Sequence, residues 1–129
     1  MTKPLARICW IVVFLLYFAA LAWLCFGNIE PGENIPRALF GIPIDQCVHF
    51  TMFLPFPILC TIAFRDRSWW RTLCWSTLAA NVIAILFESQ QHNINPYRYT
   101  QASDLVANLM GITLGLFVMA LIGVLTHKK

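Results

Sequence analysis

The sequence predicts an all-α, polytopic membrane protein: a compact bundle of four transmembrane helices with both termini in the cytoplasm. Hydrophobic residues make up 59% of the 129 residues and charged residues only 12%, whereas a soluble domain carries about 45–50% and about 25%. Four apolar stretches are each close to the length that crosses a hydrocarbon core of about 30 Å. The basic residues gather on one side of these stretches.

The same composition excludes several other classes of protein. The chain has too few polar residues to cover a water-facing globule, and too many apolar residues for a disordered protein. A formal net charge of +3 is too small for a surface that follows nucleic-acid phosphates, so we expect no nucleic-acid partner. A span needs roughly 20 residues, so the chain holds at most about four or five spans. We therefore expect a single domain, residues 1–129.

The helices are expected at about 8–26, 46–64, 70–90 and 104–125. The first stretch carries no charged residue, and none of the four shows the period-two alternation of barrel strands. Lys3 and Arg7, followed by the apolar run and Ala20-Leu21-Ala22, also resemble a secretory signal peptide. An apolar run of about 19 residues exceeds the usual hydrophobic region of a signal, which favours an uncleaved helix.

Orientation follows from the basic residues. Seven of the nine lie on one side of the predicted spans: Lys3, Arg7, Arg65, Arg67, Arg71, Lys128 and Lys129. Only Arg37 and Arg98 lie on the other side, in the longer connections 28–47 and 88–104. The positive-inside rule therefore predicts cytoplasmic termini and outward-facing long connections. We expect a multi-pass protein of the cell membrane, the bacterial cytoplasmic membrane, surrounded by membrane lipids.

Polar residues from three helices are predicted to converge at one depth. At 1.5 Å per helical residue, His49 lies roughly 24 Å from the cytoplasmic boundary at Arg65, and Asp45 about 30 Å. Glu88 lies roughly 25 Å from the boundary of its own helix, and Asn108 and Asp104 roughly 30–36 Å from theirs. These groups therefore meet near the outer membrane–water boundary.

The spacing along each helix supports a common site. Asp45 and His49 are four residues apart and share a face, as do Asp104 and Asn108. Glu88, Gln91 and His92 share a face if the third helix continues until Asn95-Pro96 ends it. Arg98 follows in the loop, where it can reach a carboxylate or an anionic ligand. The candidate catalytic residues are Asp45, His49, Glu88 and Asp104, and the candidate substrate-binding residues are Gln91, Arg98 and Asn108.

Each of these residues also has a structural interpretation. His49 can be an interfacial histidine bonded to a backbone carbonyl, and Asp104, after Ser103, can be the N-cap of the fourth helix. Arg98 can pair with a phospholipid headgroup. For any one of these residues alone, the structural interpretation explains its position at least as well as the functional one. The matched depth favours a functional cluster, because ionisable residues within membranes tend to be functional.

The polar residues also resemble the motifs of VanZ-like membrane proteins. That family typically reads Asp-Lys-x-x-His-Phe, Glu-x-x-Gln, and Arg-x5-Asp-Leu-x-Ala-Asn-x-x-Gly-x-x-x-Gly. The matching positions here are Asp45, His49-Phe50, Glu88, Gln91, Arg98, and the run from Asp104 through Asn108 and Gly111 to Gly115. Gln46 replaces the usual Lys. The resemblance covers about 45–115 and implies the family's short four-helix form. It also implies a link to resistance against the glycopeptide teicoplanin, with which the member that names the family is associated.

These observations leave three functional hypotheses. The first is an outward-facing site that binds or processes a lipid-linked or cell-envelope amphiphile, with His49 as general base, Glu88 as acid and Arg98 on a phosphate or carboxylate. The second is an accessory or structural membrane protein whose polar cluster is a helix-packing network. The third is a zinc or manganese hydrolase with ligands from Asp45, His49, Glu88, His92 and Asp104. The missing HExxH-type spacing disfavours the third, so no metal ligand and no cofactor are assigned, and an oligomer is compatible with any of them.

Overall fold

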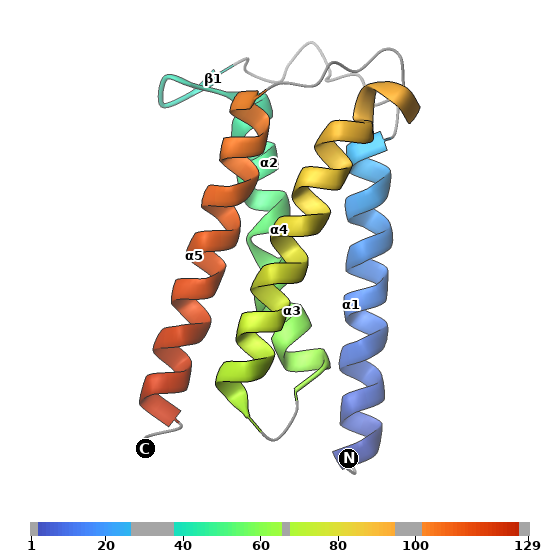
Figure 1. Ribbon diagram of the computed structural model, residues 1–129, viewed down its shortest axis with the longest axis vertical. Helices are drawn as coiled ribbons and strands as arrows, with labels where there is room; N and C mark the ends of the chain where they lie inside the picture. Colours follow the sequence, from blue (N-terminus) through green and yellow to red (C-terminus); the bar gives the residue numbers. More distant parts are fainter. Residues whose placement is uncertain (1–2, 27–37, 66–67, 95–101, 127–129) are drawn as a thin grey trace.

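Five helices and one small hairpin make up the computed structural model, which describes residues 3–26, 38–65, 68–94 and 102–126 (Figure 1). Their order along the chain is α1 (Lys3–Phe26), β1 (Ala38–Leu39), β2 (Ile42–Pro43), α2 (Ile44–Phe53), α3 (Pro55–Ala63), α4 (Trp69–Ile94) and α5 (Ala102–Thr126). α2 and α3 follow one another along the same direction and together form one span. Four helical segments are long and apolar enough to cross a membrane, as the sequence predicts: Lys3–Phe26, Gln46–Ala63, Trp69–Gln90 and Ser103–Thr126.

Two prolines explain the break in the second span. Pro55 and Pro57 have no backbone N–H, so the carbonyls of Thr51 and Phe53 lose their usual helical donors. The helix is interrupted by a turn at Leu54, although the Leu54 amide still donates to the Phe50 carbonyl at 3.2 Å. Tyr17 of α1 donates its hydroxyl hydrogen to the Met52 carbonyl beside the break. A neighbouring helix thus supplies a donor where the backbone ladder is irregular, as hydrocarbon surroundings require.

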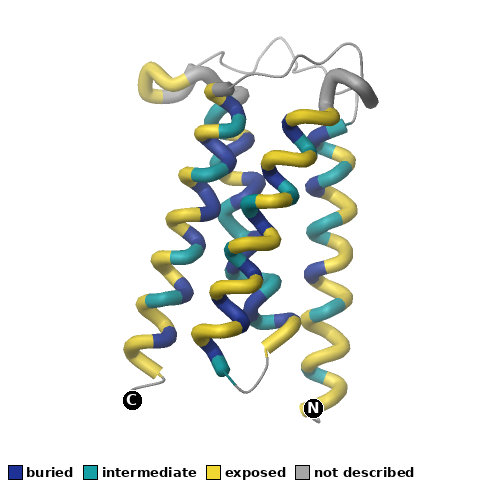
Figure 2. The backbone as a smooth tube through the Cα atoms, viewed as in Figure 1, coloured by how far each residue is buried: buried dark blue, intermediate teal, exposed yellow. Residues whose placement is uncertain are grey.

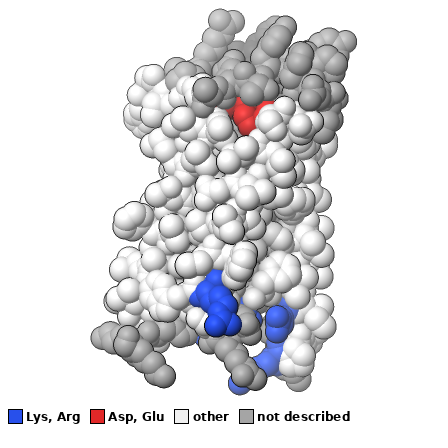
Figure 3. Space-filling view, viewed as in Figure 1, with Lys and Arg blue, Asp and Glu red and all other residues white. Residues whose placement is uncertain are grey.

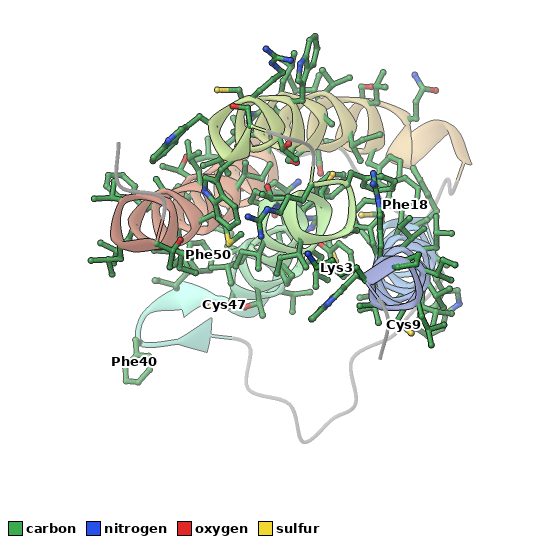
Figure 4. All side chains as sticks on the ribbon, turned by 90° about the horizontal axis from the view of Figure 1, so that it is seen from below. Lys3, Cys9, Phe18, Phe40, Cys47 and Phe50 are labelled. Atoms are coloured by element: carbon green, nitrogen blue, oxygen red, sulfur yellow. The ribbon has the colours of Figure 1, made fainter. Side chains whose placement is uncertain are left out.

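The second span lies at the centre of the bundle and contacts the other three (Figure 4). Its first half, α2, packs most extensively against α5, because Gly111 allows the two backbones to approach closely. Its second half, α3, contacts α1, α4 and α5. Towards α1 the packing is aromatic, with the rings of Phe14 and Phe56 edge to face at 5.4 Å.

Burial follows the helix faces (Figure 2). Buried side chains such as Phe53 and Ile112 point inward, while large apolar side chains such as Leu16, Trp23 and Phe117 are mostly exposed on the outside. An apolar exterior of this extent is costly in water and is expected against lipid. The fold is therefore compatible with a multi-pass membrane protein.

The two ends of the bundle differ in charge. α1 begins and α5 ends at the same end of the molecule (Figure 1). The face in Figure 3 shows Lys and Arg side chains at this end and acidic side chains near the opposite end. This distribution agrees with the asymmetry on which the predicted orientation rests.

Besides the break within the predicted helix 46–64, the structure departs from the predicted elements in two places. The connection 28–47 contains an antiparallel hairpin, in which Leu39 pairs with Ile42 across a turn at Phe40 and Gly41. Both turn residues have positive φ, 54° and 79°, and the Phe40 side chain points away from the helices (Figure 4). In addition, α1 begins at Lys3 and not near residue 8, since Pro4 is tolerated in the first turn of a helix.

Candidate functional site

A buried polar cluster lies at the end of the bundle opposite the chain termini. It joins His49 of α2, Glu88 of α4, and Asp104 and Asn108 of α5. One ligating atom each from His49, Glu88 and Asp104 lies within 4.8 Å of the other two. Three helices far apart in the sequence thus bring ionisable groups together at one level, as the counted depths predict.

His49 is held between two residues of α5. Its Nδ1 lies 2.9 Å from Asn108 Oδ1, and because an amide oxygen only accepts, Nδ1 carries the proton and donates it. Its Nε2 lies 3.6 Å from Asp104 Oδ2, within ion-pair range but longer than an ordinary hydrogen bond. In the neutral imidazole, Nε2 therefore has no proton, and its lone pair is on the Asp104 side of the ring.

The cluster is shielded from solvent. The exposed fractions are 4% for His49, 4% for Glu88, 7% for Asp104 and 1% for Asn108. Two carboxylates this close and this deeply buried either have a compensating positive charge nearby or share a proton, which neutralises one of them. The site can therefore hold a proton, an ammonium or guanidinium group, or a metal cation, and this is the basis of any chemistry there.

Local sequence explains how α2 and α5 present these groups. Asp104 and Asn108 are four residues apart, so both project from one face of α5. One turn further along, Gly111 lies against the Phe50 backbone, next to His49 in sequence. A side chain at Gly111 would separate the two helices, so the glycine brings His49 within reach of Asn108.

The other predicted site residues fall partly outside the described structure. Asp45 lies in the first turn of α2 and Gln91 in the last turns of α4, which continues to Ile94 before Asn95-Pro96 as expected. The side chains of Asp45 and Gln91, and all of Arg98, lie outside the described residues, so their predicted roles stay predictions.

An open groove runs along the outer surface of the α2–α5 pair, with a cavity volume of about 660 Å³. This volume is within the range of about 300–1,000 Å³ that is typical of small-ligand pockets. The lining residues come from β2 and from the same turns of α2 and α5 that carry the cluster: Ile42, Gln46, Cys47, Phe50, Thr51, Ser103, Val106, Ala107 and Met110.

The groove is mostly apolar. Gln46 and Ser103 line it near the starts of α2 and α5 together with Ile42, and Phe50 and Met110 line it one turn or more deeper together with Thr51. The groove is not evident from the sequence. In the sequence, its lining residues look like other exposed residues of an apolar helix. Their side chains form a concave surface only because α2 and α5 pack against each other.

No protein-family model matches the sequence, and no curated protein or solved structure matches it. The geometry of the cluster and of the groove is therefore the basis for a functional proposal.

Proposed function

We propose that the protein is a VanZ-like membrane protein that binds a lipid-linked or cell-envelope amphiphile at the outer face of the membrane. One observation carries the proposal: a buried cluster of His49, Glu88, Asp104 and Asn108 lies beside a mostly apolar groove, with the polar side chains of Gln46 and Ser103 near the starts of α2 and α5. An amphiphile at the interface presents a polar head and an apolar chain. The orientation, with both termini cytoplasmic, rests on the distribution of basic residues.

The proposed mode of binding assigns each part of the ligand to one part of the protein. The apolar chain lies along Phe50, Val106 and Met110, and the headgroup lies at the level of Gln46, Ser103 and the cluster. Arg98, which follows α4 in the sequence, binds a phosphate or carboxylate of the headgroup. His49 and the carboxylates then either process the headgroup by proton transfer or only recognise it.

The groove is tested by filling it. Val106→Trp places an indole in the groove, whereas Val124→Trp makes the same change on the same helix near its opposite end, and both valines are 54% exposed. We expect Val106→Trp to retain at least about fivefold less polyprenyl-phosphate lipid after purification, measured by native mass spectrometry, and Val124→Trp to retain the wild-type amount. A fivefold loss corresponds to about 1 kcal/mol. Equal retention in both variants would refute the proposed groove.

The cluster is tested separately with Glu88→Gln and Asp104→Asn, which keep the side-chain shape. Loss of turnover of a labelled envelope lipid, with normal stability and lipid retention, supports chemistry at the cluster. If the wild-type protein retains the labelled lipid but does not convert it, the result supports a binding protein. The resemblance to VanZ-like proteins adds a cellular test, in which expression of the wild type, but not of Asp104→Asn, lowers sensitivity to teicoplanin.

The second candidate function is an accessory or structural protein whose cluster is a packing network. The hydrogen bond between His49 and Asn108 favours it, because this bond ties α2 to α5 directly. Under this alternative, each of three substitutions lowers the unfolding temperature in detergent: His49→Ala, Glu88→Ala and Asp104→Asn. The protein that remains folded retains as much lipid as the wild type.

A further inference from the structure

We propose that His49, Glu88 and Asp104 bind a single divalent transition-metal ion, zinc or manganese, at the outer end of the bundle. The inference goes beyond the proposed amphiphile binding and does not depend on it. The same site would hold the ion whether the protein is an enzyme, a binding protein or a structural one.

The donor set is the first support. The cluster offers one imidazole nitrogen and two carboxylates, and all three side chains are buried. Imidazole favours zinc and its neighbours in the first transition series, and carboxylates suit zinc and manganese alike. Three protein ligands leave at least one coordination position for water or a substrate oxygen, which is the arrangement of catalytic sites and not of closed structural ones.

The distances fit an ion with little rearrangement. Metal–ligand bonds of about 2.0–2.2 Å at tetrahedral angles separate two ligand atoms by about 3.4 Å. The observed distance from His49 Nε2 to Asp104 Oδ2 is 3.6 Å. The widest separation among the three ligand atoms is 4.8 Å at most. A shift of about 1 Å in the ligand atoms would bring all three to the separation that one ion requires.

The hydrogen bond behind the histidine is the second support. Metal-ligating histidines usually donate their other ring N–H to an oxygen, which fixes the tautomer and the orientation of the ring. His49 Nδ1 does this to Asn108 Oδ1 at 2.9 Å, so the Nε2 lone pair is directed toward the Asp104 side of the cluster. Asn108 is 1% exposed, and burial limits its rotation. The imidazole is thus oriented in advance as a ligand.

Electrostatics favours a cation of charge +2. With both carboxylates ionised and the imidazole neutral, these three side chains would together carry a charge of −2. A divalent ion balances the set and forms a bond to each member. Arg98 is the competing source of positive charge, and the test below includes it.

The spacing argument against a metal does not apply to this arrangement. A motif such as HExxH detects two ligands on one helix. Here the three ligands come from α2, α4 and α5, one each, so no short spacing in the sequence can reveal them.

The test measures metal binding to the purified full-length chain, stripped with chelator and then titrated with Zn²⁺ or Mn²⁺ alone. We expect about one ion per chain by elemental analysis after dialysis, and a higher unfolding temperature with the metal. His49→Gln and Asp104→Asn should each weaken binding at least tenfold. Asn108→Ala, which removes the support behind the ring, should weaken it about 10–100-fold.

Controls separate this site from thiols and from the amphiphile. Cys9 and Cys74 are exposed, so a Cys9→Ser, Cys74→Ser variant must still bind one ion. Co²⁺ in the site should show visible ligand-field bands without the intense near-ultraviolet band of thiolate ligation. The inference is overturned if the wild type binds no ion, if binding persists in His49→Gln, or if only Arg98→Gln creates a site. Lipid retention measured on the same samples shows whether the proposed function fails with it or survives.

Discussion

Replacing Gly111 with Ala tests whether close helix packing builds the polar cluster. A Cβ at this position would lie 2.2 Å from the Phe50 carbonyl oxygen and 3.1 Å from its carbon, both of them backbone atoms. Carbon–oxygen contacts of this kind normally span about 3.3–3.6 Å. Because backbone atoms cannot rotate away, α2 and α5 must separate by about 1 Å or more at this level.

The magnitude follows from two opposing effects. Alanine is the better helix former by about 1 kcal/mol in water, so an isolated α5 would gain stability. Overpacking in a tight contact costs about 1–3 kcal/mol. The separation also stretches the 2.9 Å bond from His49 to Asn108 past hydrogen-bonding distance, which costs about 0.6–1.7 kcal/mol among buried interhelical bonds. We expect a net loss of about 2 kcal/mol.

The assay is reversible unfolding in mixed detergent micelles, monitored by circular dichroism, with Thr113→Ala as the control. Thr113 is exposed on the same helix and its hydroxyl bonds only the Leu109 carbonyl of its own helix, so its loss should change the unfolding free energy by less than about 0.5 kcal/mol. Gly111→Ala should also bind metal more weakly, although residue 111 is not a ligand. A variant as stable as the wild type, or more stable, would refute the packing argument.

Two further changes test single features of the fold. Tyr17→Phe removes the donor to the Met52 carbonyl beside the proline break and should lower the unfolding free energy by about 1 kcal/mol in the same assay, while Ser89→Ala, an exposed hydroxyl bonded within its own helix, should not. Phe40→Asn relieves a positive φ that costs a non-glycine residue about 1–2 kcal/mol. Asn-Gly suits this hairpin turn, so amide exchange at Leu39 and Ile42 should slow. Faster exchange would mean that the exposed phenyl ring itself anchors the hairpin.

The sequence is sufficient to predict the number of helices long and apolar enough to cross a membrane, and that residues from three of them converge. Spans are set by a local property, the length of an apolar run, and depth along a helix follows from residue counting. That is why His49, Glu88 and Asp104 could be assigned to one level without any contact information. The same arithmetic cannot give rotation about the helix axis, so the pairing of His49 with Asn108 needed the structure.

Features that depend on the angle between two helices were out of reach of the sequence. The groove beside α2 and α5 is one, because a valine in a groove and a valine on a ridge look alike in sequence. The selection of His49, Glu88 and Asp104 from the five predicted metal ligands is another, because it depends on how the three helices are rotated against one another. The hairpin was missed for a different reason. Ala38-Leu39-Phe40-Gly41 has no Asn or Asp before its glycine, so the usual signal of a tight turn is weak.

The shallow position of the cluster decides what kind of chemistry it can support. His49 lies about 7.5 Å below the start of α2, Asp104 about 3 Å below the start of α5, and Glu88 about 9 Å below the end of α4. The cluster is buried, but only one or two helical turns separate it from this end of the bundle, and the apolar groove opens beside it. A charged group at the bilayer centre would have only the protein for solvation. In the proposed orientation, carboxylates near the boundary would exchange protons or a cation over a short distance and would act on a headgroup that stays at the interface.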